Sequence, residues 1–222
     1  MNTSPCLPSI PILFENDDII AVNKPEGLAS IPERVREKDC VLSLLSSLSH
    51  RKLYIVHRLD KETSGVLIFA KNAAAHKCLN QQFSRREIKK MYVALTHGEI
   101  PENSGIIDKP LHQFGSGRVG VDAQKGKSSA TEFGVARRFR DYTLVNVYPS
   151  TGRRHQIRSH LYSIGHPIVG DLLYGDKALQ QKFPRLMLHA QKITLHLPSS
   201  EIVTIEAPIP ESFKAVIDAI SL

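Results

Sequence analysis

Tryptophan is absent from this chain of 222 residues, and cysteine occurs only three times, as Cys6, Cys40 and Cys78. The three cysteines are far apart and form no Cys-x-x-Cys pair. This spacing argues against a disulfide framework and against a zinc site, and it is typical of a protein from a reducing compartment. We therefore expect a cytoplasmic protein without a metal site.

Long hydrophobic runs are also absent. Because no stretch of 18 apolar residues occurs, we expect no transmembrane helix and no membrane partner. The N-terminal segment MNTSPCLPSIPILFEN lacks a basic stretch followed by an apolar one, so we expect no secretory signal. The apolar fraction of 41% is sufficient for a sizeable core. We expect one catalytic-size domain over residues 1–222 and, by default, a monomer.

Acidic residues are scarce in the middle of the chain. Residues 51–160 carry 20 basic and 9 acidic side chains, a net charge of +11, whereas the flanking segments are slightly acidic. A positive field confined to one region usually serves a nucleic-acid partner. The alternative is an ordinary basic protein with solvated lysines. The arginine clusters ARRFR and TGRRHQIR favour nucleic acid, because guanidinium groups match phosphate oxygens.

Strands dominate the expected secondary structure. The run ILFENDDIIAVNKPEG predicts a hairpin that turns at Asn16-Asp17, and residues 101–128 are expected to form a loop with short strands. Further strands are expected near 54–57, 65–70, 89–100, 129–139, 142–149, 186–198 and 201–208, and helices near 41–50, 73–87, 153–165 and 210–222, the third with Thr151 as N-cap. This pattern favours an α+β fold with a mixed or antiparallel sheet.

Three short motifs suggest a cofactor or a metal but lack the necessary context. The sequence GSGRVG (115–120) matches the dinucleotide fingerprint, yet no buried strand precedes it and no helix follows it. The sequence GVDAQKGKS (120–128) resembles a phosphate-binding loop with one residue too many. His155 and His160 lie five residues apart, so on one helix their rings point in different directions. We therefore expect no cofactor, and we expect His155 to form a hydrogen bond or to face a phosphate.

A charged segment lies between two apolar runs in YIVHRLDKETSGVLIFAK (54–71). Asp60 stands there among His57, Arg58 and Lys61. Cationic neighbours favour an ionised carboxylate, so Asp60 is expected to be an anion that can act as nucleophile or base. A turn-capping aspartate is the alternative. The second basic cluster, TGRRHQIR, opens a predicted helix, where backbone amides and arginines would favour an anion.

These segments resemble the motifs of the RluA family of pseudouridine synthases. VHRLDKETSGVLIFAKN resembles the family signature, and four other segments follow the family order: ILFENDDIIAVNKPEGL, KKMYVAL, TGRRHQIRSHLYSIGHPIVGDLLYG and RLMLHAQKITLHLP. The resemblance covers residues 12 to about 208. It implies one catalytic domain with a curved central sheet flanked by helices. We expect no N-terminal S4 domain, which many members carry, because the first motif begins at residue 12.

The resemblance also implies roles for individual residues. Asp60 falls on the catalytic aspartate, Tyr92 on the tyrosine that lies against the target base, and Arg158 on the arginine that pairs with the aspartate. Arg58 falls on the arginine that enters the RNA stack when the uridine is flipped out. Further RNA contacts are expected from His57, Lys90, Arg153, Arg154 and His155, with phosphate contacts from Arg85, Arg86 and Lys89.

The implied activity is the isomerisation of uridine to pseudouridine in rRNA or tRNA, without a cofactor. The bond from C1′ to N1 breaks, the uracil rotates, and C5 joins C1′. The residues leave open whether Asp60 attacks C1′ or removes the proton from C2′. Two alternatives also remain open here: an RNA-binding module that no longer reacts, and a glycosylase that releases free base.

Overall fold

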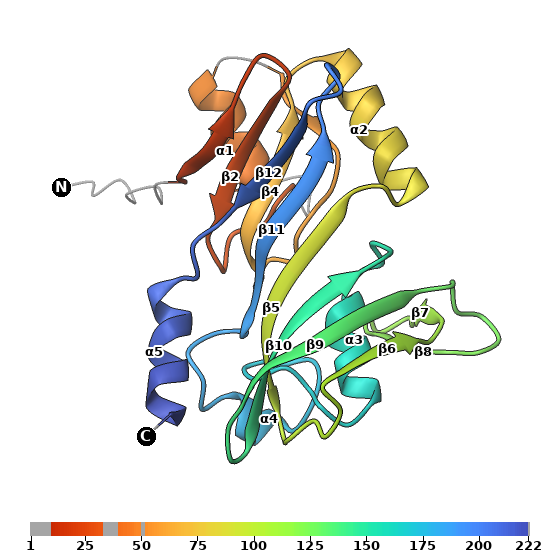
Figure 1. Ribbon diagram of the computed structural model, residues 1–222, viewed down its shortest axis with the longest axis vertical. Coiled ribbons are helices and arrows are strands. Elements are labelled where there is room, and N and C mark those ends of the chain that lie inside the picture. Colours follow the sequence, from red (N-terminus) through yellow and green to blue (C-terminus); the bar gives the residue numbers. More distant parts are fainter. Residues whose placement is uncertain (1–9, 33–39, 50–51, 222) are drawn as a thin grey trace.

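Ten strands form one mixed sheet in the computed structural model, which describes residues 10–32, 40–49 and 52–221 (Figure 1). The strands are β1 (Ile12–Glu15), β2 (Ile19–Lys24), β3 (Tyr54–Ile55), β4 (Ser64–Ala70), β5 (Lys89–His97), β6 (Ser104–Asp108), β7 (Leu111–Gln113), β8 (Val119–Val121), β9 (Ala130–Arg138), β10 (Tyr142–Pro149), β11 (Leu188–His196) and β12 (Ile202–Glu206). The helices are α1 (Val41–Ser49), α2 (Ala73–Arg85), α3 (Gln156–Ser163), α4 (Lys177–Gln180) and α5 (Glu211–Ile220).

The order of the main sheet is β1-β2-β4-β11-β5-β10-β9-β6, with β3 paired to β4 and β12 paired to β11. Its strand pairs are antiparallel except β4 with β11, and β7 and β8 form a separate hairpin. The sheet carries helices along its length, with α1 and α2 at one end and α3, α4 and α5 at the other (Figure 1). The predicted α+β class with a mixed sheet is confirmed.

Strand β4 lies in the core of the N-terminal half. All its residues are buried, and they face two clusters in alternation: Ile68 packs with the cluster that includes α2, whereas Leu67 and Phe69 pack with the cluster that includes α1. A strand covered on both faces needs apolar side chains at every position. The continuous run GVLIFA therefore reflects burial on both sides of the strand. The connection that carries Asp60 leads directly into this buried strand and is anchored by it.

The second half of the chain builds its own core around β5, β10, α3 and α5, with Val145, Val147, Leu161 and Phe213 among its buried residues. Tyr92 on β5 packs against this core and against the cluster beside α1. Tyr92 therefore lies at the junction of the two halves. No helix of the described residues is long and apolar enough to cross a membrane.

The segment 101–128, which was predicted to be a loop with short strands, contains β6 and the β7–β8 hairpin. Strand β6 forms an edge of the main sheet. The prediction that Thr151 is an N-cap was wrong: the cap residue of α3 is His155, in the left-handed conformation with φ of 50°. Thr151 instead donates its hydroxyl proton to Gln156 Oε1 at 2.6 Å. The left-handed residue delays the start of the helix, so the turn before it points into the site. Cys6 lies outside the described residues.

Gly65 tests whether the close approach of β4 to its parallel partner β11 is needed for the stability of the fold. Its φ is +117°, and a Cβ there would lie 2.1 Å from the carbonyl oxygen of Ala190 on β11. We expect Gly65→Ala to destabilise the fold by about 3 kcal/mol or more and to lower Tm by roughly 6–12 °C. Gly134→Ala is the matched control on β9, because a Cβ there meets nothing within 4 Å. Equal Tm values for the two variants would contradict this account.

Candidate active site

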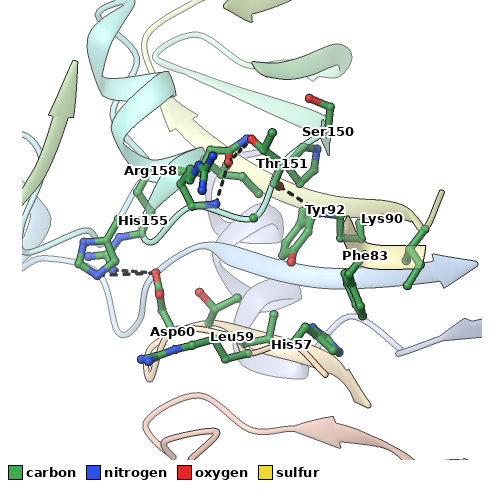
Figure 2. A pocket seen from close by; sticks show the side chains of 18 of the residues that line it. His57, Leu59, Asp60, Phe83, Lys90, Tyr92, Ser150, Thr151, His155 and Arg158 are labelled. Atoms are coloured by element: carbon green, nitrogen blue, oxygen red, sulfur yellow. Dashed lines mark hydrogen bonds and ion pairs between the residues drawn. The ribbon is translucent and has the colours of Figure 1, made fainter. Parts of the chain in front are cut away.

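Asp60, Tyr92 and Arg158 meet at one cleft although they lie far apart in the sequence. The cleft has a volume of about 320 Å³. It is lined by the connection between β3 and β4, the C-terminal end of α2, strand β5 and the turn between β10 and α3. Figure 2 shows Asp60 and His57 on one wall and Arg158 and Thr151 on the opposite wall, with Tyr92 between them.

The backbone beside Asp60 is fixed by Ser30, from the segment that follows β2. The Ser30 hydroxyl donates to the carbonyl oxygen of Leu59 at 2.8 Å and accepts the Leu59 amide proton at 3.0 Å. Both Ser30 and Leu59 are buried. A reciprocal pair of buried hydrogen bonds is costly to break on either side. The residue immediately before Asp60 therefore has little freedom to move.

The residue after Asp60 is fixed by a buried lysine. The Lys24 ammonium donates to the carbonyl oxygens of Pro25, Leu28 and Lys61 at 2.8, 2.6 and 2.9 Å. Its three N–H groups are thereby all satisfied, although burial lowers the pKa of Lys24 to about 7. Asp60 thus stands between two backbone positions that are held in place by the last residue of β2 and by the segment that follows it.

Arg158 on α3 connects two carboxylates. Its Nε and Nη2 donate to Oδ2 and Oδ1 of Asp171, each at 2.7 Å, and its Nη1 donates to Oδ2 of Asp60 at 3.2 Å. Burial opposes the charge on Arg158, but the hydrogen bonds and the attraction of the two aspartates outweigh it and raise its pKa above the ordinary value. The guanidinium is therefore a permanent cation that orients Asp60 from one side.

Asp171 is a site residue that the sequence analysis did not identify. Its side chain is completely buried, and it fixes two of the nitrogens of Arg158. A signal was present in the sequence, because Asp171 stands inside the apolar stretch IVGDLLY. A buried acid needs a cationic partner, but the identity of that partner depends on the tertiary fold.

His155 lies beside the same carboxylate. Its Nε2 is 3.9 Å from Oδ2 of Asp60, and its Nδ1 is 3.2 Å from the hydroxyl oxygen of Tyr174. Burial is the largest effect on the ring and lowers its pKa; Asp60 opposes this, and Arg158 adds to it. The imidazole is therefore neutral at neutral pH.

Two side chains of β5 complete the cleft. Burial raises the pKa of the Tyr92 phenol, and the charge of Asp60 raises it further, so Tyr92 is a protonated phenol at neutral pH. Its ring projects into the cleft (Figure 2). Lys90 donates to the carbonyl oxygen of Thr151 at 3.0 Å, and burial lowers its pKa to about 8. Lys90 therefore ties β5 to the turn before α3.

The other predicted RNA contacts lie in the cleft, in a groove beside it, or outside both. Arg58, Arg86 and Arg153 line the cleft. Arg153 also lines an adjoining groove, together with Arg154 and residues of the segment 111–127. The remaining predicted phosphate contacts, Arg85 and Lys89, lie outside both linings. Their RNA contacts stay predictions.

His57 has a structural contact in addition to its place in the cleft lining. Its Nε2 accepts the amide proton of Ile68 at 3.0 Å, which continues the pairing of β4 beyond the end of β3. An imidazole that accepts this bond must be unprotonated at Nε2. Burial and the charge of Lys90 lower the pKa of His57 to about 3. A phosphate contact from His57 would therefore involve a neutral ring.

Comparison with known proteins shows the family to which the chain belongs. The family model described as RNA pseudouridylate synthase matches residues 18–163. The dual-specificity RNA pseudouridine synthase RluA of Escherichia coli K12 is 39% identical over 206 residues, which cover 90% of this chain and 94% of the relative. RluA of Vibrio vulnificus is 40% identical over 204 residues, which cover 88% and 81% of the two chains.

A solved structure has the same fold. The human RNA pseudouridylate synthase domain containing 1 superposes with a TM-score of 0.79 at 26% identity, covering 100% of this chain and 98% of the human one. The chain therefore belongs to the RNA pseudouridylate synthase family. It is an isomerase of the RluA type that acts on uridine in RNA. The resemblance stated from the sequence motifs is confirmed.

The neutral His57 predicts an acid-sensitive fold. Between its ordinary pKa of 6.5 and its folded value of about 3, the unfolded chain binds a proton that the folded chain does not. Stability should therefore fall as the pH falls from about 6.5, by up to about 1 kcal/mol per pH unit. His57→Gln keeps an acceptor for the Ile68 amide but does not titrate, so its Tm should fall less steeply with acid.

The control for this prediction is the exposed His196, whose replacement by Gln should leave the pH dependence of Tm unchanged. Thermal unfolding of the three proteins at several pH values measures the difference. Identical slopes for wild type and His57→Gln would contradict the assignment of a neutral, hydrogen-bonded ring.

Asp171→Asn tests whether the buried acid positions Arg158. We expect turnover to fall by roughly 10–100-fold, because Arg158 loses its anionic partner and shifts relative to Asp60. The KM for RNA should change by less than about threefold, since Asp171 is buried and does not line the cleft. Single-turnover kinetics separate the two effects. Asp218→Asn on the exposed face of α5 is the control, and a loss confined to KM would contradict the assignment.

Proposed function

We propose that this enzyme isomerises specific uridines in rRNA or tRNA, with Asp60 as the essential carboxylate. The observation that carries the proposal is the arrangement of Asp60 with Arg158. One oxygen of Asp60, Oδ2, is bound by Arg158 at 3.2 Å, whereas Oδ1 has no hydrogen bond with any described residue. The Asp60 side chain is 19% exposed. One oxygen is thus fixed and the other is available to a ribose in the cleft.

The reaction requires little else from the protein. C1′ loses its bond to N1, the uracil turns, C5 joins C1′, and the proton lost from C5 balances the one gained at N1. A carboxylate close to the ribose suits both open routes, attack at C1′ and removal of the C2′ proton. Arg158 orients Asp60 in either case, through the hydrogen bond from its Nη1 to Oδ2.

Tyr92 could act on the uracil as a base for the C5 proton or as a surface against which the ring stacks, and its environment favours the second role. Because burial raises the pKa of the phenol, the phenolate is scarce at neutral pH. A protonated phenol is a poor base for the C5 proton, whereas its ring remains suited to stacking against uracil. We propose that Tyr92 supports the base while it turns.

The exposed cations around the cleft support RNA binding. Extrusion of a base from folded RNA costs a few kcal/mol, and phosphate contacts from arginines such as Arg58, Arg153 and Arg154 would offset that cost. The RluA relatives are named dual-specificity enzymes, which supports more than one RNA substrate. We further propose that the enzyme acts without a cofactor and as a monomer. We also propose a cytoplasmic location, which agrees with the unpaired thiols of Cys40 and Cys78.

The target uridine can be identified without a candidate sequence. Pseudouridine maps of rRNA and tRNA from a strain that lacks the gene and from its parent should differ at the sites that this enzyme modifies. A short RNA with that sequence then serves as substrate for purified protein. Complete agreement of the two maps would contradict the proposed substrate classes.

Asp60→Asn tests the central role. We expect turnover to fall by at least about 10³-fold while RNA binding persists, because the variant keeps the shape but loses the reacting anion. Pseudouridine formation is measured chemically, and free uracil is measured in the same samples. Glu62→Gln is the matched control: this neighbouring carboxylate is 55% exposed and 3.9 Å from Arg158, so its loss should cost little. Retained turnover in Asp60→Asn would refute the mechanism, and release of uracil by wild type would indicate a glycosylase.

A further inference from the structure

The backbone of His155 is unusual for a residue that caps a helix. It adopts the left-handed conformation, with φ of 50° and ψ of 21°, and its side chain makes no capping hydrogen bond to α3. This conformation costs energy for a non-glycine residue, and it persists only where the surrounding structure holds it in place. The imidazole of this residue faces Asp60 (Figure 2).

The partners of Tyr174 determine which nitrogen of His155 carries the proton. The Tyr174 hydroxyl donates to the carbonyl oxygen of Val119 at 2.9 Å and accepts the Val119 amide proton at 3.1 Å. The single phenolic proton is therefore used, and the contact of 3.2 Å to His155 Nδ1 requires Nδ1 to be the donor. In the neutral ring, Nε2 is then an unprotonated acceptor.

That acceptor has no hydrogen-bond partner among the described residues. Nε2 of His155 faces Oδ2 of Asp60 at 3.9 Å, and Oδ2 already accepts a hydrogen bond from Arg158 Nη1. No buried side-chain nitrogen or oxygen of the described residues lacks a partner, so Nε2 is accessible to a donor that enters the cleft, and a donor between the two acceptors would relieve their repulsion. Hydrogen bonds of about 2.8 Å from one hydroxyl oxygen can reach either atom across this gap.

The chemistry of the substrate limits what this donor can be. A phosphate has no proton to give and would be repelled by the Asp60 carboxylate. The ribose 2′-hydroxyl is a donor attached directly to C2′ and adjacent to C1′, the two atoms on which Asp60 is proposed to act. It is also the group that distinguishes RNA from DNA at a given nucleotide.

We propose that His155 is a specificity-determining residue whose Nε2 accepts a hydrogen bond from the 2′-hydroxyl of the target ribose. The contact selects ribose over deoxyribose and places the sugar against Asp60. The low pKa that burial gives His155 keeps the acceptor available. This inference rests on the proposed function, since it concerns the same uridine and the same cleft, and it specifies a hydrogen bond as the RNA contact predicted for His155.

The test compares two substrates that differ by one oxygen atom. One is the mapped RNA with its natural uridine, and the other carries 2′-deoxyuridine at that position alone. Wild type should convert the ribose substrate at least about tenfold faster, because a bound deoxyuridine would cover the Nε2 acceptor without giving it a donor. His155→Ala should lose about tenfold on the ribose substrate and less than about threefold on the deoxy substrate, so its preference should nearly disappear.

The matched control is His160, a second buried histidine on α3. Its ring nitrogens are bonded to Thr131 Oγ1 at 2.8 Å and to the carbonyl oxygen of Lys109 at 2.9 Å, away from the cleft. His160→Gln should therefore keep the wild-type preference for ribose even if it lowers stability. If His155→Ala does not fold, His155→Asn serves instead. Asn tolerates positive φ but is too short to reach the Nε2 position, so the same loss of preference is expected.

Three results would overturn the inference. Equal conversion of both substrates by wild type would show that the 2′-hydroxyl is not recognised. Equal losses on both substrates in the His155 variants would show that the residue acts on folding or chemistry alone. Loss of the preference in His160→Gln would show a nonspecific effect. Inactivity of wild type on the ribose substrate would instead refute the proposed function, and with it this inference.

Discussion

The active site depends on one buried cation placed between two anions. Removing a guanidinium and a carboxylate from water costs several kcal/mol for each ion, and Arg158 and Asp171 offset that cost with two bonds of 2.7 Å. This pairing leaves only Nη1 for Asp60, at 3.2 Å. Without Asp171, the guanidinium would be able to bind both oxygens of Asp60 and so occupy the one that the ribose needs. The second acid therefore limits how strongly the first is bound.

The backbone of the cleft is likewise held by contacts between segments that are far apart in the sequence. Asp60 belongs to the connection that leads into β4, yet Lys24 at the end of β2 and Ser30 in the segment after it fix the residues on either side of Asp60. Gly65 allows β4 to pass close to β11, and β11 pairs in turn with β5, which carries Tyr92. A catalytic side chain on a connection thereby gains the rigidity of the sheet.

The sequence motifs predicted Asp60, Tyr92 and Arg158, and they predicted the fold class, because long ordered motifs preserve both. They did not show Asp171, because a bidentate ion pair depends on two segments that meet only in the folded chain. The environment of Lys24 was equally hidden, since a lysine beside proline and glycine is usually exposed. For His155 the sequence left open a hydrogen bond or a phosphate contact; it did not show the left-handed backbone or the contacts of the buried ring with Tyr174 and Asp60, which depend on the folded chain.

Charge varies across the lining of this cleft. Asp60, Asp171 and Arg158 together carry one negative charge close to the reacting position, and His155 is neutral there, whereas Lys90 and the exposed arginines bring positive charge to other parts of the lining. A phosphate is attracted to these cations and repelled by Asp60, so the backbone of an RNA strand is favoured along the cations while a ribose and its base approach Asp60. The negative charge beside the ribose also suits a reaction in which C1′ becomes electron-poor as its bond to N1 breaks. The positive field that indicates RNA binding in the sequence and the negative site that acts on the sugar are thus complementary parts of one surface.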